Sequence, residues 1–207
     1  MSIPVLPETS AKADLALRGM FAARKRVFVD LLRWDLPVLI DKYEIDQFDT
    51  PDAVYLVLTD RDGAHRASAR LLRTDRDHLL GELFPQLCKG EVPSGSQTRE
   101  ITRFCIEPRL SREERRTARN QLVTALVEYA LQSDISVYTA VADVAWFRQI
   151  SAFGWKCDAL GPVQKVAGEC LVALRIEIDP GTPHDLAATG IYCTSTFQAA
   201  VAGGVQW

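Results

Sequence analysis

The feature that most constrains the fold is a predicted strand that contains both an acidic and a basic residue. The run Arg99–Ile106 is rich in residues that favour a pleated, half-buried strand, and Pro108 follows its end. The same run contains Glu100 and Arg103, and unpaired charge is costly to bury. Because a regular strand would point these two side chains to opposite faces, a bulge or a splayed edge is needed to bring both into one cleft. The alternative is that both lie at the solvated end of an ordinary strand.

The composition favours one globular domain. The chain has 207 residues, of which 47% are hydrophobic and 25% charged, and its formal net charge is -3. This charge gives no general attraction to nucleic acid or to an anionic membrane, so an acidic partner would need a local basic patch. Residues 1–20 lack the apolar core of a signal peptide, and no run is long enough to span a membrane. We therefore expect a cytoplasmic protein.

The cysteines and histidines predict reduced thiols and no metal site. The five cysteines form no C-x-x-C pair and are odd in number, which argues against a disulfide framework. The three histidines are scattered and complete no metal-ligand spacing.

Hydrophobic periodicity predicts a succession of strands and helices. Apolar residues at helical spacing predict a helix from Thr9 or Ser10 to about Trp34–Pro37, and the acidic segment Asp35–Pro51 is expected to be a long loop. Ser111, with Glu114 three residues later, is expected to cap a long helix. The other expected elements are strands at 53–59, 64–74, 135–141, 155–160 and 169–178, a short helical piece at 79–87, a loop at 90–96, and a helix that Asp143 caps, that runs through Phe153 and that Gly154 ends.

This order of elements predicts the fold class. Three strands, a helix, a strand, a helix and two strands are typical of a mixed, mostly antiparallel sheet flanked by helices in a single three-layer α/β domain. We expect this domain to span residues 1–180. Residues 181–207 contain four Gly residues and Pro183, and no charge after Asp185. We therefore expect a loosely attached tail, in which Ile191, Tyr192, Phe197 and Trp207 could dock on the core.

The chemistry-bearing residues form one long pattern and no common motif. The sequence has no Walker loop, no G-x-S-x-G elbow, no G-x-G-x-x-G and no H-E-x-x-H. The pattern consists of Arg24-x3-Phe28-x5-Trp34, Glu44-x-Asp46-x2-Asp49, Arg70-Leu-Leu-x-Thr74 and Glu100-x2-Arg103-Phe104, with a weaker echo at Gly154-Trp155 and Gly161-Pro162.

In this pattern the sequence resembles the acyl-homoserine-lactone synthases, the LuxI-type autoinducer synthases of bacterial quorum sensing. It departs from the family at Arg99, where Trp is usual, at Thr102, where Ser is common, and at Ala67, where Gly is frequent. These changes concern the shape of the pocket more than the reaction.

The resemblance implies a fold similar to the N-acetyltransferase (GNAT) fold and a reaction of two substrates. S-adenosylmethionine is acylated on its α-amine by a fatty acyl thioester, carried by acyl carrier protein or coenzyme A. The homoserine carboxylate then closes on its own γ-carbon and expels methylthioadenosine. S-adenosylmethionine is a substrate, so no cofactor is expected. An ammonium cannot attack a thioester, so a base must take a proton, and Glu100 is the expected catalytic residue.

The resemblance also implies a binding site for S-adenosylmethionine. An aromatic face attracts a sulfonium by cation–π interaction, and the fork of an arginine suits a carboxylate. For single residues the alternatives are a core aromatic at Phe28 and solvated loop carboxylates. The expected site residues are Arg24, Phe28, Trp34, Asp46, Asp49, Arg70, Arg103 and Phe104.

Two further residue sets concern the acyl donor. Four arginines on one side of the long helix could dock an acidic acyl carrier protein, or could form a solvated face paired with Glu113 and Glu114: Arg112, Arg115, Arg116 and Arg119. Apolar residues on the late strand and helix could line an acyl pocket, or could be ordinary core: Val137, Ala140, Val141, Trp146, Phe147 and Ile150. Family members that make 3-oxo products have Ser or Thr near Ala140, with Thr139 adjacent here; we expect a donor without a 3-oxo group.

Two other functions stay open at this point. One is an acyl-coenzyme A N-acyltransferase for another amine, although Arg115–Asn120 lacks the glycines of a pyrophosphate loop. The other is a non-catalytic ligand-binding domain on the same fold.

Overall fold

A seven-stranded sheet runs through the molecule and positions the other elements. The computed structural model describes residues 8–193. The strand order is β3-β4-β5-β6-β9-β7, with β8 paired to β9, and neighbouring strands are antiparallel except for β5 and β6. The strands are β3 (Val54–Thr59), β4 (His65–Arg73), β5 (Thr98–Ile106), β6 (Val137–Asp143), β7 (Lys156–Ala159), β8 (Gln164–Val166) and β9 (Glu169–Glu177).

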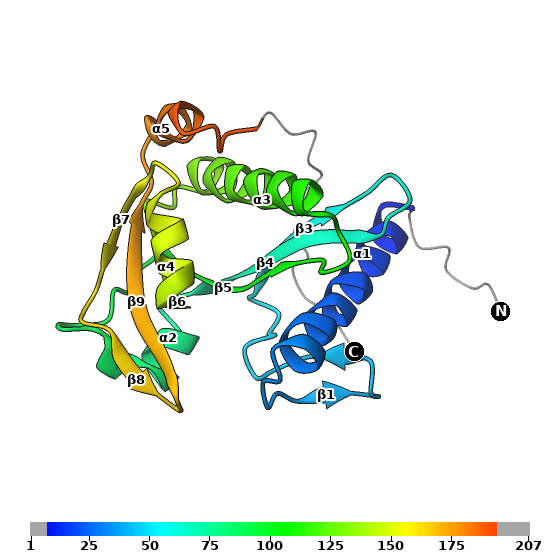
Figure 1. The fold of residues 1–207 in the computed structure, drawn as a ribbon, viewed down its shortest axis with the longest axis horizontal. Helices are drawn as coiled ribbons and strands as arrows, with labels where there is room; N and C mark the ends of the chain where they lie inside the picture. Colours follow the sequence, from blue (N-terminus) through cyan, green and yellow to red (C-terminus); the bar gives the residue numbers. More distant parts are fainter. Residues whose placement is uncertain (1–7, 194–207) are drawn as a thin grey trace.

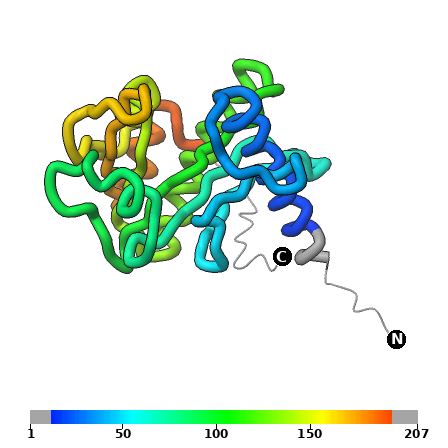
Figure 2. The backbone as a smooth tube through the Cα atoms, turned by 90° about the horizontal axis from the view of Figure 1, so that it is seen from below, coloured from blue at the N-terminus to red at the C-terminus, as the bar shows by residue number. Residues whose placement is uncertain are grey.

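Helices cover both faces of this sheet (Figure 1). One face carries α3 (Arg112–Gln132), α4 (Val144–Ser151) and α5 (Thr182–Ala188). The other face carries α1 (Glu8–Arg24), the π-helix η1 (Lys25–Leu31), α2 (Leu79–Leu83) and the 3-10 helix η2 (Pro85–Leu87). In Figure 2 the N-terminal segment and the strands after residue 150 lie at opposite ends of the molecule, as in Figure 1. The predicted three-layer, mostly antiparallel α/β fold is therefore confirmed.

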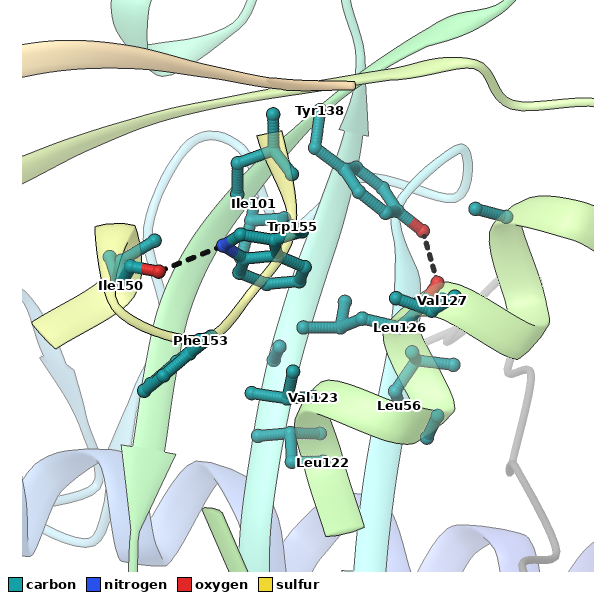
Figure 3. Packing of buried hydrophobic residues seen from close by; sticks show 14 of the residues in the cluster. Leu56, Ile101, Leu122, Val123, Leu126, Val127, Tyr138, Ile150, Phe153 and Trp155 are labelled. Carbon is teal, nitrogen blue, oxygen red and sulfur yellow. Dashed lines mark hydrogen bonds between the residues drawn. The ribbon is translucent and has the colours of Figure 1, made fainter. Parts of the chain in front are cut away.

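The largest core fills the space between the sheet and α3 (Figure 3). Leucine and valine side chains of α3 pack on residues of β3, β5 and β6 that point to the same face. The polar atoms in this core are paired, as burial requires. The Tyr138 hydroxyl donates to the Leu126 carbonyl, and Trp155 Nε1 donates to the Ile150 carbonyl, both at 2.9 Å.

Two predicted helix caps are confirmed. Glu114 N donates to Ser111 Oγ at 3.3 Å, and Ser111 N donates to the Glu114 carboxylate at 2.9 Å, which is a capping box. Asp143 accepts from the N–H groups of Ala145 and Trp146 and so caps α4. Helix α4 ends at Ser151, two residues before the predicted end, and Gly154 follows in the left-handed region at φ +107.

The N-terminal segment differs from its prediction. The α-helix stops at Arg24 and continues as a π-helix to Leu31, so Trp34 lies outside the helix. The expected loop 35–51 contains a small hairpin, β1 (Val38–Leu39) with β2 (Tyr43–Glu44). Its turn places Ile40 and Asp41 at φ +47 and +54, which a β-branched residue rarely adopts, and this is why the residue types gave no hairpin signal.

Two C-terminal elements were not predicted. The short strand β8 contains Gln164 and Lys165 and lacks a β-branched run. Helix α5 lies in the expected tail, begins with Thr182 and Pro183, and buries Leu186 in the main core. Ile191 is also buried in this core and Tyr192 packs against it, whereas Phe197 and Trp207 lie outside the described residues.

Strands β5 and β6 pair only at their starts. Thr98, Arg99 and Glu100 are in register with Val137, Tyr138 and Thr139. Beyond these three pairs β5 continues to Ile106 and β6 to Asp143 with no register partners between them. The two strands therefore form a fork, and Glu100 lies at its vertex.

Candidate active site

A bulge in β5 decides which side chains face the site. Ser68 pairs with Cys105 and Arg70 with Thr102, so the single residue Ala69 lies opposite the two residues Arg103 and Phe104. Arg103 has φ +50, as expected for an inserted residue. The extra residue shifts the alternation of side chains, so that each following side chain points to the face opposite to the one expected for a regular strand. The predicted bulge between Glu100 and Arg103 is confirmed.

The effect of the bulge is visible in the packing on the two faces. Ile101 and Phe104 both pack in the α3-side core, although they are three residues apart. Cys105 packs with Ala23 and Phe28 on the opposite face. Glu100 and Arg103 also contact elements of that opposite face.

Six charged residues form a closed ring on this face. Each carboxylate binds two arginines and each arginine binds two carboxylates, which alternate around the ring. The shortest links are Arg24 Nε to Glu44 at 2.5 Å, and Arg70 Nη1 and Arg103 Nη2 to Asp46 at 2.6 Å each. The order around the ring is Glu44, Arg24, Asp49, Arg70, Asp46, Arg103 and back to Glu44.

The ring is buried, and its electrostatics are mutually compensating. No side chain in it is more than 7% exposed. Burial disfavours the charged form of Asp49, but the hydrogen bond and charge of Arg24 hold the pKa of Asp49 below its usual range. Burial likewise opposes the charge of Arg24, whose pKa is nevertheless raised by Asp49 and Glu44. The ring thus ties the loop 35–51 and the end of α1 to strands β4 and β5.

Two aromatic residues stand beside the ring. The rings of Phe28 and Trp34 stack with centroids 5.0 Å apart and an interplanar angle of 21°. The Arg103 guanidinium lies 5.5 Å from the Phe28 centroid, and Trp34 is 46% exposed. One aromatic surface therefore faces outward next to the charged ring.

Glu100 is buried without a charged partner. Its Oε1 accepts from the N–H of Leu80 at 2.9 Å, at the start of α2, and its Oε2 has no hydrogen-bond partner among residues 8–193. Burial raises the pKa of Glu100 to about 7, although the N–H groups of Leu80 and Leu79 and the charge of Arg70 lower it. A carboxyl with this pKa can take and release a proton near neutral pH.

Thr139 lies beside Glu100 at the vertex of the fork. The two residues are register partners in parallel strands, so their side chains leave the sheet on the same face. Thr139 is fully buried, and its hydroxyl has no partner in the described part of the chain. The vertex of the fork therefore holds a buried carboxyl oxygen and a buried hydroxyl that both lack a hydrogen-bond partner in residues 8–193.

The predicted acyl-pocket residues divide between the two faces of the sheet. Ala140, Phe147 and Ile150 belong to the α3-side core together with Trp146, whose ring lies 5.2 Å from Phe104. Val141 packs on the other face with Leu80, Leu87 and Ala173. Val137 lies four residues before Val141 in β6, so it points to the same face. Phe104, predicted for the S-adenosylmethionine site, thus lies on the opposite face from the charged ring.

The predicted docking arginines also divide. Arg112, Arg115 and Arg116 are exposed and have no ion pair with any residue in 8–193, whereas Arg119 is half-buried against Phe153. Glu113 and Glu114 therefore do not neutralise them; the Glu114 side chain is used in the cap and with Arg66.

Some residues of the site were missed from the sequence as site residues. Glu44 was part of the pattern but not of the expected site, and it closes the ring. The Tyr55 hydroxyl donates to Asp49, and Thr102 Oγ1 accepts from Arg70 Nε. The signal for Glu44 was present, since Glu44 lies two residues before Asp46 and side chains at this spacing in an extended segment lie on one side.

Comparison with known proteins places this geometry in a family. The family model described as autoinducer synthase matches residues 8–185. The chain belongs to this family. An acyl-homoserine-lactone synthase of Ralstonia nicotianae is 35% identical over 175 residues, which are 81% of this chain and 83% of that protein. The resemblance inferred from the residue pattern is confirmed, and with it an acyltransferase family.

Solved structures of autoinducer synthases share the whole architecture. TofI, in a ternary complex with an inhibitor and MTA, is 30% identical with a TM-score of 0.72, and covers 92% of this chain and 94% of its own. MesI, a CoA-dependent acyl-homoserine lactone synthase, is 26% identical with a TM-score of 0.78, and the coverages are 90% and 94%. A Lactobacillus plantarum protein described as an N-acetyltransferase, at 18% identity and a TM-score of 0.54, shares the fold alone. The predicted likeness to the GNAT fold is confirmed.

Two properties of the described part of this autoinducer synthase bear on the remaining predictions. The described helices include none that is long and apolar enough to cross a membrane. Residues 8–193 contain no group of His, Cys, Asp and Glu arranged to hold a metal ion. The roles of the individual site residues remain predictions.

Proposed function

We propose that the protein acylates the α-amine of S-adenosylmethionine from an acyl thioester and then forms an N-acyl-homoserine lactone, with Glu100 as the base. The observation that carries this proposal is the vertex of the fork. A buried carboxyl with a pKa of about 7 and a free oxygen lies where β5 and β6 separate. An amine and a thioester that meet at this point would be within reach of the base.

The first step needs a proton acceptor. Ionised Glu100 takes a proton from the substrate ammonium, directly or through one water molecule, and the neutral amine attacks the thioester carbonyl carbon. The C–S bond breaks, and the sulfur takes the second proton from the nitrogen and leaves as a thiol. General-base assistance of this kind contributes roughly 10² to 10⁴-fold.

The second step needs no base. The homoserine carboxylate attacks its own γ-carbon, the bond from that carbon to the sulfonium breaks, and its electron pair stays on sulfur. One negative and one positive charge are consumed, so lactone and methylthioadenosine both leave neutral. TofI was solved in a complex with MTA, and MTA stands for methylthioadenosine, the second product expected here. This supports the proposal.

The aromatic pair supports the same substrate. A sulfonium against the exposed face of Trp34 would gain about 0.5–2 kcal/mol from cation–π attraction. Phe28 holds that indole in a stacked position, and the Arg103 guanidinium contacts the Phe28 ring. The closed ring supplies a rigid wall for the substrate, whose amine and carboxylate would lie along the wall on the Glu100 side.

The donor is expected to be held by the positive face of α3. Arg112, Arg115 and Arg116 are exposed without counter-charges in residues 8–193, which suits an acidic acyl carrier protein in the cytoplasm. MesI is described as CoA-dependent, so coenzyme A is the other candidate carrier. Reversal of Arg115 and Arg116 to Glu should raise KM for a carrier-bound donor and leave KM for acyl-coenzyme A less changed.

The test is mass spectrometry of culture extracts. A heterologous bacterium that expresses the wild-type chain should release compounds with the homoserine-lactone fragment, absent from the empty-vector culture. Glu100→Gln should lower the yield and the turnover of purified enzyme at least tenfold, because Gln keeps the hydrogen bond from Leu80 but cannot take a proton. S-adenosylmethionine binding, measured by calorimetry, should change little.

Two results would contradict the proposal. Wild-type protein that is folded and supplied with a broad acyl pool, yet forms no lactone, would favour another amine acceptor or a non-catalytic domain. Equal turnover by Glu100→Gln would remove Glu100 as the base.

A further inference from the structure

The N–H groups that donate to Glu100 belong to the first turn of a very short helix. Helix α2 has five residues, its N-cap residue is His78, and the His78 side chain makes no capping hydrogen bond. Glu100 Oε1 accepts from Leu80 N at 2.9 Å, and the N–H of Leu79 also acts on this carboxylate. A helix of this length does not hold its own first turn in place. The direction of the two N–H groups therefore depends on contacts outside the helix backbone.

The ring of His78 makes one such contact, to the loop before the helix. His78 is buried, and its Nδ1 lies 2.7 Å from the carbonyl oxygen of Arg76. Because a carbonyl oxygen can only accept, Nδ1 carries a hydrogen and donates it. The ring thus ties residue 76 to the residue that starts α2.

The same ring lies against Gly81, inside α2. A Cβ on Gly81 would be 2.7 Å from Cε1 of His78, which is closer than side chains approach one another. The ring cannot swing away from such a Cβ while its Nδ1 stays bonded to Arg76. Glycine disfavours a helix relative to alanine. Its presence at position 81 is explained by the ring that rests on it.

Packing alone does not account for a histidine at this position. Nε2 of His78 is buried and has no hydrogen-bond partner among residues 8–193, and such an atom is unfavourable. A phenyl ring would cover Gly81 without this cost. The contact that only a polar side chain supplies here is the hydrogen bond to the Arg76 carbonyl.

Helix α2 has a second anchor, on the side of the sheet. The Leu80 side chain is fully buried with Leu87 and Ala173. This anchor sets how closely α2 approaches the sheet, whereas the His78 contacts oppose rotation of the first turn about it. Rotation matters because a hydrogen bond weakens steeply as its angle departs from linear.

We infer that His78 is a positioning residue for the reaction, and that it keeps the N–H groups of Leu79 and Leu80 aligned on Glu100. The inference rests on the proposed function, because it assumes that Glu100 is the base. Gly81 belongs to the same device, since it gives the ring its place on the first turn.

The device has a consequence for the titration of Glu100. The groups that face this carboxyl are the two N–H groups of α2, the charge of Arg70 in β4 and the hydroxyl of Thr139 in β6. Burial raises the pKa of Glu100, and the N–H groups and Arg70 lower it. Of these groups only the N–H pair depends on His78. Loss of their alignment should therefore raise this pKa further and leave less ionised base at neutral pH.

The first test compares two substitutions of His78. His78→Phe keeps a ring on Gly81 and removes the donor to Arg76, so kcat at pH 7 should fall about tenfold while KM for both substrates stays within about threefold. The inflection of kcat/KM should move to higher pH. His78→Asn keeps a donor near the place of Nδ1 and should recover most of the turnover. His184→Phe, at an exposed position of α5, is the control and should change none of these values.

The second test approaches the contact from Gly81. Gly81→Ala should displace the ring and lower kcat as His78→Phe does, although alanine favours the helix. In a His78→Asn background, which lacks Cε1, the same substitution should cost less, so the two changes should not be additive. Gly90→Ala is the matched control, because a Cβ there meets no atom within 4 Å. This pair of variants decides the question if His78→Phe does not fold.

The titration of Glu100, followed by NMR, separates this inference from the proposed function. In protein labelled at the glutamate carboxyl carbons, the signal that Glu100→Gln lacks belongs to Glu100. Its midpoint should rise in His78→Phe or Gly81→Ala whether or not the protein makes lactone, whereas absence of lactone from wild type refutes the proposed function alone. An unchanged midpoint in a variant that circular dichroism shows to be folded would overturn the inference. Equal losses in His78→Asn and His78→Phe would also overturn it, because they would assign His78 to packing.

Discussion

The pKa of Glu100 is high because this buried carboxyl has no ion pair within the described residues. Arginines lie close by, yet all three arginines of the ring are committed to other carboxylates. Two backbone N–H groups partly offset its burial, and the resulting pKa is about 7. A direct ion pair would have lowered this pKa and left a carboxylate too weakly basic to take a proton from an ammonium.

The raised pKa predicts a cost in stability that depends on pH. The unfolded carboxyl releases its proton near pH 4.5, whereas the native one holds it up to about pH 7, so native Glu100 binds more protons between these values and stability falls as pH rises. Glu100→Gln should therefore gain stability over wild type on the order of 3 kcal/mol at pH 8 and almost none at pH 4.5. Urea unfolding at the two pH values measures this. A gap that is independent of pH would contradict the assignment.

The same titration should appear in the kinetics. Because the proposed base acts in its ionised form, kcat/KM should fall as pH decreases through about 7, the pKa of Glu100. The pH profile of the free enzyme, measured with a donor whose chemistry is rate-limiting, reports this pKa. A profile that is flat from pH 6 to 8.5 would be inconsistent with Glu100 as the base.

At the scale of elements, the ring joins parts that are far apart in the chain. It connects the last residue of α1, the hairpin loop, β4 and the bulge of β5. Each of these four elements alone would bury charged side chains without counter-charges. The ring therefore favours folds in which all four elements pack together. This explains why the loop 35–51 is ordered although its residues show little periodicity.

Removal of one ring member should be strongly destabilising. Arg24→Met leaves two buried carboxylates each short of one partner, and breaking a buried pair of this kind typically costs about 3–5 kcal/mol. The urea midpoint should fall with an unchanged m-value. Arg73→Met is the control, because Arg73 pairs with Asp75 near the surface, and it should shift the midpoint little. Equal shifts for both variants would show that burial of the ring contributes nothing.

The strands and helices were predictable where local pattern and tertiary packing agree. Ser111 with Glu114, and Asp143 with the turn at Gly154, mark helix ends by hydrogen bonds within a few residues, and the structure has them. The π-helix was not predictable, because Val27, Phe28 and Leu31 also fit the apolar spacing of an ordinary α-helix. Helix α5 was missed because it depends on Leu186 entering a core made by distant elements.

The site was predictable in membership but not in arrangement. The residue pattern identified Arg24, Asp46, Asp49, Arg70 and Arg103, and all of them meet in one cluster. That they close on one another as a ring depends on three-dimensional angles that spacing does not contain. The placement of Phe104 on the far face follows from the bulge, which a count of alternating residues cannot locate.

At the scale of the whole molecule, the C-terminal segment is attached along α3 by a ladder of polar contacts. Asn120, Thr124 and Glu128 follow at intervals of four residues, so they lie on one side of the helix. Asn120 binds the Gly190 carbonyl, the Thr124 hydroxyl accepts from the Cys193 N–H at 3.0 Å, and Glu128 accepts from the Tyr192 hydroxyl at 2.9 Å. Residues 190–193 thus continue the fold beyond α5.

The ladder can be broken at its centre without changing side-chain shape. Thr124→Val leaves the Cys193 N–H without its acceptor, which should cost about 1–2 kcal/mol and speed hydrogen exchange at residues 190–193. Thr117→Val, at an exposed position of the same helix, is the control and should not affect this exchange. Unchanged protection in Thr124→Val would mean that Leu186 and Ile191 hold the segment alone.

The closed ring also determines what an approaching cation experiences. Charges that alternate around a small loop cancel at a distance, since each attraction is matched by a repulsion of nearly equal range, and the remaining field falls off steeply. A sulfonium beside Trp34 would therefore be held by short-range polarisation and contact, with little long-range attraction. Affinity for S-adenosylmethionine should then be nearly independent of ionic strength, whereas capture of an acidic donor by the open arginines of α3 should weaken as salt is added. One enzyme would thus recognise its two substrates through forces of different range.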